Sequence, residues 1–103
     1  MDEEIPGLIF SENMEKYSVV ELAKQLVSLD SQRPDGTESK VSQFIFDHLK
    51  SLGLKPEKQF YDEKENRFNV LVFGSETATV MINVHIDTVS INDPKNWKHD
   101  PFG

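Results

Sequence analysis

The run Val80-Met81-Ile82-Asn83-Val84 is nearly continuous in apolar character. Valine and isoleucine favour strands, so the run predicts a strand over Thr79–Ile86. The lack of alternation between apolar and polar residues indicates that this strand is covered on both faces. The helices and strands together predict an α/β layer. Two helices alone can hardly cover both faces of every strand in it.

Two helices are predicted ahead of the strands. Ser18 and Glu21 fit a capping box, and apolar residues at helical spacing follow until about Asp30. Turn residues then begin at Arg33 and continue through Pro34-Asp35-Gly36.

The second helix is predicted over Glu38–Leu52. Thr37 is expected to cap it, Glu38 to complement its dipole, and Gly53 to end it in a left-handed conformation. Val41 begins the apolar stripe along one side of this helix.

Beyond this helix the period of the apolar residues changes from 3.6 to 2. Lys55–Tyr61 is read as a strand, and 62–66 as a charged connector. Phe68–Phe73 is expected to pair with Thr79–Ile86 as an antiparallel hairpin, because only five residues separate them. The predicted fold is α/β, with two helices packed on a mixed β-sheet over residues 17–103. Residues 1–16 are read as an N-terminal extension.

Composition excludes several classes of function. Eleven Lys and Arg against 18 Asp and Glu give a net charge of −7, which disfavours nucleic acid or an anionic membrane as a partner. Without cysteine, the chain can form no disulfide or thiolate zinc site. The acidic start Met1-Asp2-Glu3-Glu4 does not resemble a secretory signal, and no apolar run reaches the ~20 residues of a membrane span. A cytoplasmic location is expected.

The candidate chemistry lies at His85 and Asp87, where the apolar run meets a polar loop. Alternation along a strand places both side chains on one face, about 7 Å apart along the strand. A neutral imidazole binds metal, and a nearby carboxylate can fix its tautomer. The pair is thus a plausible metal half-site. A local ion pair at a strand end is an equally good interpretation of the two residues alone, and two ligands are too few for zinc.

The remaining candidates have simpler explanations. His48 is expected at the boundary of the second helix and His99 in the terminal loop, neither with a strong claim to a ligand. Glu21 and Glu38 are explained by helix capping and the helix dipole. Trp97 is expected to anchor its loop to the core.

The motif around His85 carries a family likeness. Val84-His85-Ile86-Asp87-Thr88-Val89, followed by Trp97 and Asp100-Pro101-Phe102, resembles the first metal motif of the zinc-dependent amidohydrolases. That family includes acetylornithine deacetylase, succinyl-diaminopimelate desuccinylase, aminoacylase and the glutamate carboxypeptidases. The likeness covers residues 17–103. One departure is Ser90, where the family commonly has proline, and it affects the stiffness of the loop rather than metal ligation.

The resemblance implies an N-terminal part of a two-metal catalytic domain. By this likeness His85 is a metal ligand, and Asp87 is the catalytic carboxylate that orients it. The implied cofactors are two divalent ions, zinc or alternatively cobalt or manganese, and the implied substrate is an N-acyl amino acid or small peptide. The family's other ligands and its glutamate base lie downstream of the matched residues, so this chain alone is expected to be inactive.

Association of the chain is a further expectation. The family's inserted lid domain often forms dimers, and this chain by itself is expected to self-associate through exposed strand edges. The alternative interpretation is a small α/β binding or interaction module without chemistry, in which the His-x-Asp pair is structural.

Overall fold

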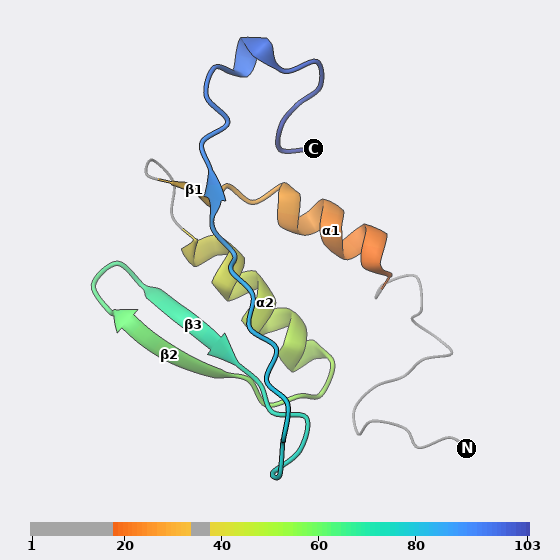
Figure 1. Ribbon diagram of the computed structural model, residues 1–103, viewed down its shortest axis with the longest axis vertical. Coiled ribbons are helices and arrows are strands. Elements are labelled where there is room, and N and C mark those ends of the chain that lie inside the picture. Colours follow the sequence, from red (N-terminus) through yellow and green to blue (C-terminus); the bar gives the residue numbers. More distant parts are fainter. Residues whose placement is uncertain (1–17, 34–37) are drawn as a thin grey trace.

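The computed structural model describes residues 18–33 and 38–103 (Figure 1). Its elements, in chain order, are α1 (Val19–Val27), β1 (Gln32–Arg33), α2 (Ser39–Ser51), β2 (Glu57–Asp62), β3 (Arg67–Leu71), β4 (Thr88–Val89) and the short 3-10 helix η1 (Pro94–Asn96). The α/β class is confirmed, but the strands form two separate two-stranded sheets rather than one mixed sheet. The predicted extension over residues 1–16 lies outside the described residues.

Helix α1 begins where its capping residue predicted. The side chain of Ser18 accepts a hydrogen bond from the backbone N–H of Glu21 at 3.2 Å, which satisfies one of the free donors of the first turn. The helix ends at Val27, three residues before the expected Asp30. None of its residues is buried, so α1 contributes little to the core.

Helix α2 ends in the predicted left-handed glycine. Gly53 has φ 84°, and its N–H donates to the carbonyl of Lys50 at 3.0 Å. The N–H of Leu54 donates to the carbonyl of Leu49 at 3.2 Å, which completes a Schellman motif. The predicted cap Thr37 lies outside the described residues, and the residue before the helix, Glu38, makes no capping hydrogen bond.

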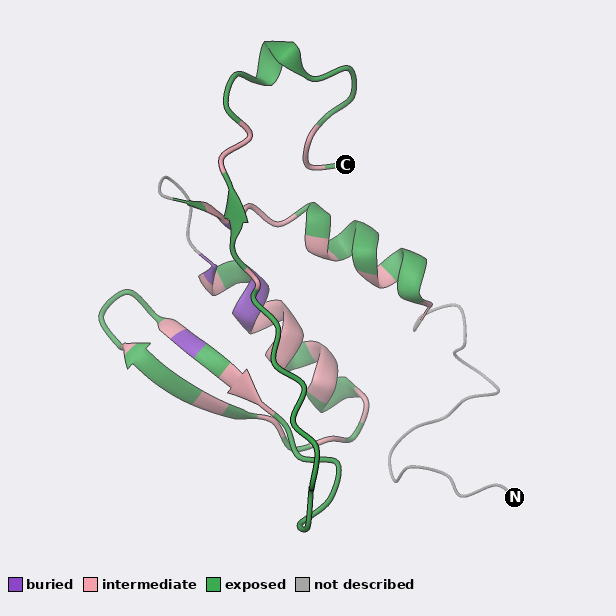
Figure 2. Ribbon diagram, viewed as in Figure 1, coloured by how far each residue is buried: buried purple, intermediate pink, exposed green. Residues whose placement is uncertain are grey.

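The core lies where α2 packs on a hairpin formed by β2 and β3. The two strands pair antiparallel, with Phe60 opposite Phe68, and residues 63–66 of the predicted charged connector form their turn, while Asp62 pairs with Arg67. Phe68 of β3 is 1% exposed and Val41 of α2 is 4% exposed, and the buried residues lie on these two elements and at the start of the helix (Figure 2). The hydroxyl of Ser42 donates to the backbone carbonyl of Phe68 at 3.2 Å, which joins the helix directly to the strand.

The predicted hairpin between Phe68–Phe73 and Thr79–Ile86 is wrong. β3 takes β2 as its partner, and residues 79–87 run as an extended segment that belongs to no sheet (Figure 1). The expectation that this segment is covered on both faces is also wrong, since Val80 and Ile82 are 78% and 86% exposed. An isolated segment cannot complete its own ladder, and no described strand lies beside it to do so.

The end of this extended segment is held by a parallel pair of short strands. In β1 and β4, Gln32 lies opposite Thr88, and the N–H of Thr88 donates to the carbonyl of Ser31 at 3.1 Å. The side chain of Gln32 also accepts from the N–H of Ile91 at 3.1 Å. Neither strand was predicted, because both lie in polar sequence. Together these two strands hold the backbone directly after Asp87, at the end of the extended segment.

The glycine that ends α2 gives a direct test of the fold. We expect Gly53→Ala to lower the free energy of unfolding by about 1 kcal/mol, because a Cβ is strained at positive φ. Urea unfolding followed by circular dichroism measures this. Gly74→Ala is the matched control: it has no heavy atom within 4 Å of the added Cβ and should leave stability nearly unchanged. Equal effects from the two substitutions would contradict the assigned helix end.

Candidate metal half-site

The side chains of His85 and Asp87 face each other at the end of the extended segment. Nδ1 of His85 lies 2.9 Å from the backbone carbonyl oxygen of Asp87 and 3.4 Å from its carboxylate Oδ1. Both side chains are exposed, at 84% and 53%. The contact predicted from the His-x-Asp spacing is therefore present, although the segment that carries it is not part of a sheet.

This contact fixes which imidazole nitrogen is free. A carbonyl oxygen can only accept a hydrogen bond, so the bond to the carbonyl of Asp87 requires Nδ1 of His85 to carry the proton. In the neutral ring Nε2 then keeps its lone pair, which is the form of imidazole that binds a metal. The carboxylate of Asp87 lies on the protonated side, as in the carboxylate–histidine pairs that orient metal ligands. The pair fits the ligand end of a metal site.

The two residues line one end of an open groove of about 1030 Å³. One wall of the groove is β3 with the residues after it, including Val70 and Val72, and the other is the extended segment from Ala78 to Asp87. Apolar side chains contribute more of the lining than polar ones, but the charged side chains of Arg33, Glu38 and Arg67 line the groove as well. A ligand held at His85 would thus lie beside a mixed surface that offers both apolar contact and polar partners.

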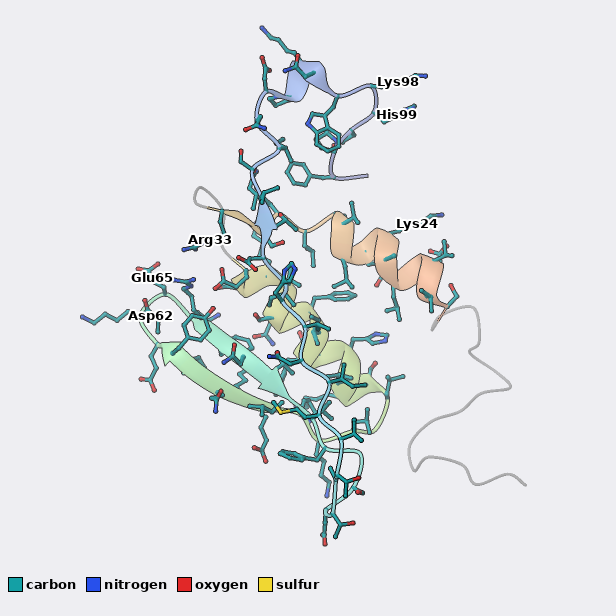
Figure 3. The ribbon with its side chains drawn as sticks, viewed as in Figure 1. Lys24, Arg33, Asp62, Glu65, Lys98 and His99 are labelled. Carbon is teal, nitrogen blue, oxygen red and sulfur yellow. The ribbon has the colours of Figure 1, made fainter. Side chains whose placement is uncertain are left out.

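The described part of the chain gathers no complete set of metal ligands. Among residues 18–33 and 38–103, no three His, Cys, Asp or Glu side chains gather so that they could hold an ion. His48 stacks on Phe44 in α2, with ring centroids 6.0 Å apart. His99 lies exposed on the loop after η1 (Figure 3). The described residues therefore bring His85 and Asp87 together but gather no third candidate ligand with them.

The loop after the half-site is held by its own backbone. The indole N–H of Trp97 donates to the carbonyl of Ile91 at 2.8 Å, and Asp93 caps η1 through the N–H of Lys95 at 2.9 Å. Asp100 accepts from the N–H of Phe102 at 2.9 Å. Trp97 is still 47% exposed, so it anchors the loop to itself and not to the core, which corrects the sequence-based expectation.

A buried carboxylate that the sequence analysis explained only by the helix dipole forms a second polar cluster. The side chain of Glu38 is 6% exposed, and its Oε1 accepts hydrogen bonds from the hydroxyl of Tyr61 and from Nε of Arg67, the latter at 2.8 Å. Arg33, which lies in β1, places a guanidinium nitrogen 3.7 Å from Oε2 (Figure 3). The cluster joins the start of α2 to both strands of the hairpin. No sequence spacing indicates it, because its members are far apart in the chain.

The surroundings of Glu38 favour its charged form. Burial alone would raise the pKa of this carboxyl, but hydrogen bonds from Tyr61 and Arg67 and the charge of Arg67 outweigh burial and lower the pKa below its ordinary 4.5. Burial and the hydrogen bond to Glu38 raise the pKa of Tyr61. Within the described part of the chain, Oε2 of Glu38 accepts no hydrogen bond.

We expect Glu38→Gln to destabilise the fold by about 2 kcal/mol near neutral pH, because the buried acceptor of two part-buried hydrogen bonds loses its charge. Since the folded pKa lies below 4.5, the contribution of Glu38 is complete above that pH and is lost as the pH falls through the folded pKa. The difference between wild type and variant in urea unfolding should therefore shrink in acid. Glu63→Gln, on the exposed hairpin turn, is the control. A difference that stays constant down to about pH 3 would contradict this role for Glu38.

No helix in the described residues is both long and apolar enough to cross a membrane.

Comparison with known proteins supports the likeness seen around His85. The chain is 29% identical over 108 residues to N-formyl-4-amino-5-aminomethyl-2-methylpyrimidine deformylase of Bacillus subtilis (strain 168), covering 99% of this chain and 25% of the relative. It is 28% identical over 85 residues to succinyl-diaminopimelate desuccinylase of Wigglesworthia glossinidia brevipalpis, covering 82% of this chain and 21% of that protein. It is 28% identical over 96 residues to acetylornithine deacetylase of Proteus mirabilis (strain HI4320), covering 87% and 24%.

No family model matches the chain, and no solved structure matches it significantly. The chain spans about a quarter of the length of the curated relatives that it matches. Two of those relatives carry the names of enzymes in the family that the motif resembles. Over most of its length, the chain is thus a distant homologue of the amidohydrolases that include acetylornithine deacetylase and succinyl-diaminopimelate desuccinylase.

Proposed function

We propose that this chain supplies one metal ligand of a metal-dependent amidohydrolase that cleaves the amide bond of an N-acyl amino acid or small peptide. His85 is the ligand, through Nε2, and Asp87 is the carboxylate that orients it. The observation that supports this most directly is the contact of Nδ1 of His85 with Asp87, which leaves the lone pair of Nε2 free. The homology to deacylating enzymes supplies the class of reaction.

Each residue has a distinct part in this proposal. Divalent ions at such a site polarise a scissile carbonyl and lower the pKa of water. His85 offers a single neutral nitrogen to that site, and its exposed ring meets no protein group that would compete for Nε2 among the contacts of the described residues. Asp87 holds the proton of the ring on Nδ1 and favours one ring orientation. The apolar side chains of the groove, such as Val70 and Val72, would lie against uncharged parts of a substrate.

The proposal also sets what the chain cannot do alone. One imidazole is a weak site for zinc, which takes three protein ligands even in open catalytic sites. A general base is needed as well to move the proton from water to the leaving amine. We therefore expect the chain by itself to hold no stoichiometric zinc and to hydrolyse no amide. Zinc binding and amide hydrolysis would require a protein that also supplies the further metal ligands and the general base.

A hybrid enzyme tests the assignment. This chain replaces the matching quarter of the Bacillus subtilis deformylase, and deformylation and bound metal are measured. We expect His85→Ala to reduce bound metal and to lower activity by about 100-fold or more, and Asp87→Asn to lower it by about 10–100-fold with less loss of metal. His99→Ala, which removes an exposed imidazole in the next loop, is the matched control. If His85→Ala and His99→Ala behave alike, the non-catalytic interaction module is the better interpretation.

A measurement on the chain itself covers the case in which the hybrid does not assemble. The geometry predicts that the neutral ring of His85 is protonated at Nδ1, which ¹⁵N chemical shifts of the ring report above about pH 8. Added Zn²⁺ should perturb Nε2 of His85 before either nitrogen of His99. A ring protonated mainly at Nε2 would remove the proposed ligand atom and reject the assignment.

A further inference from the structure

One peptide group connects the half-site to β1, which lies beside β4 at the end of the extended segment (Figure 1). The carbonyl of Asp87 accepts the hydrogen bond from Nδ1 of His85, and the N–H of Thr88 belongs to the same peptide group. That N–H donates to the carbonyl of Ser31, a buried residue directly before β1, at 3.1 Å. Because N–H and C=O point in opposite directions across a trans peptide, this bond sets the direction in which the carbonyl of Asp87 points.

Gln32 provides a second attachment three residues further along the chain. Its Oε1 accepts a hydrogen bond from the N–H of Ile91 at 3.1 Å. The carboxylate of Asp30 orients the side chain, since it accepts from the backbone N–H of Gln32 and from its Nε2, each at 3.1 Å. An amide whose nitrogen faces a carboxylate has its oxygen free for another donor, which here is Ile91. Asp30 and Gln32 thus clamp the chain that follows Asp87.

The clamp is also connected to the loop and to the core. The carbonyl of Ile91 accepts from the indole N–H of Trp97 at 2.8 Å, so the N–H and the carbonyl of this residue are both hydrogen-bonded. On the other side, a guanidinium nitrogen of Arg33 in β1 lies 3.7 Å from Oε2 of Glu38, whose carboxylate is hydrogen-bonded to the hairpin. β1 therefore links the half-site to the core of helix and hairpin.

We propose that Gln32 is a positioning residue for the metal ligand His85. Together with the carbonyl of Ser31, its side chain holds the peptide group between Asp87 and Thr88 in one orientation. The carbonyl of that peptide group then keeps the proton of the imidazole on Nδ1 and leaves the lone pair on Nε2. This inference rests on the proposed role of His85 as a metal ligand.

Two physical effects connect the clamp to the imidazole. The side chain of His85 is 84% exposed, so water can replace the carbonyl of Asp87 as the acceptor whenever that carbonyl turns away. A neutral imidazole can carry its proton on either nitrogen, and the acceptor beside it decides which. Hydrogen bonds in a chain also polarise one another, so the bond from Thr88 to Ser31 makes the carbonyl of Asp87 a stronger acceptor.

Replacing Gln32 tests the clamp in the 103-residue chain itself. Gln32→Leu removes the acceptor for the N–H of Ile91. We expect hydrogen exchange at the N–H groups of Ile91 and Thr88 to accelerate by about fivefold or more. The ratio of Nδ1–H to Nε2–H in the neutral ring of His85 should fall by about threefold or more. ¹⁵N chemical shifts of the ring above about pH 8 report this ratio.

Gln43→Leu is the matched control. Gln43 makes the same two kinds of side-chain hydrogen bond, since its Nε2 donates to Asp47 at 2.9 Å and its Oε1 accepts from Nζ of Lys58 at 2.9 Å. This variant loses as many hydrogen bonds as Gln32→Leu but leaves β1 and the loop untouched. Exchange at Ile91 and the proton position in the ring of His85 should therefore stay as in the wild type.

An exchange of chemical groups separates the clamp from a general loss of stability. Gln32→Glu keeps an oxygen for the N–H of Ile91 but places a second carboxylate beside Asp30, and the two charges repel each other. Adding Asp30→Asn supplies a donor to the introduced carboxylate and keeps an acceptor for the backbone N–H of residue 32. The double variant should bring exchange at Ile91 and the ratio in His85 back to within about twofold of the wild type.

Three results would overturn the proposal. One is an unchanged ratio and unchanged exchange in Gln32→Leu, and another is an equal change in Gln43→Leu. The third is Gln32→Glu behaving alike with and without Asp30→Asn, and this comparison also decides if circular dichroism shows that Gln32→Leu does not fold. In each case a wild-type ring protonated at Nδ1 leaves the role of His85 intact. A wild-type ring protonated mainly at Nε2 would overturn both that role and this inference.

Discussion

The structure depends on the packing of one helix against one hairpin. Phe68 of β3 and Val41 of α2 are the buried apolar residues of these elements, and the hydroxyl of Ser42 donates to the backbone carbonyl of Phe68. At the start of α2 the carboxylate of Glu38 binds Tyr61 and Arg67, one from each strand. A core of so few residues leaves little excess stability, since stability comes from a small difference between large terms. A charged hydrogen-bond cluster that joins three elements consequently matters more here than it would in a larger domain.

The remainder of the chain contacts this core through a few local interactions and not through a packed helix or sheet face. Helix α1 buries no residue, and the segment over 79–87 is attached to the body mainly through the pair of two-residue strands at its end. These strands position the residues that follow the segment but give it no covered face. The exposure of Val80 and Ile82 and the groove beside them have the same cause. The segment has the composition of a strand covered on both faces, but no strand lies beside it in the described chain.

Sequence reasoning succeeded where the chemistry is local. Ser18 caps α1 through the N–H of a residue three positions away, and Gly53 ends α2 through hydrogen bonds to the preceding turn. Both partners of each interaction are therefore close together in the sequence. The contact of His85 with Asp87 is local in the same sense. Reasoning failed where the partner is distant. The composition of Thr79–Ile86 indicates a strand but not which strand pairs with it. The sequence around Glu38 indicates only an interaction with the helix dipole, because Arg67 comes close to it only when the hairpin packs on α2.

The local origin of the His85–Asp87 contact has a consequence for how such a site is built. Most catalytic side chains are oriented by residues from other elements, so their geometry disappears when those elements are absent. Here the acceptor lies two residues along the same chain, and the orientation of the imidazole survives although its segment belongs to no sheet. A ring that is already oriented loses less conformational entropy when it binds an ion. In the proposed metal site, the His-x-Asp spacing would thus contribute a ligand that is already oriented before the other ligands assemble around it.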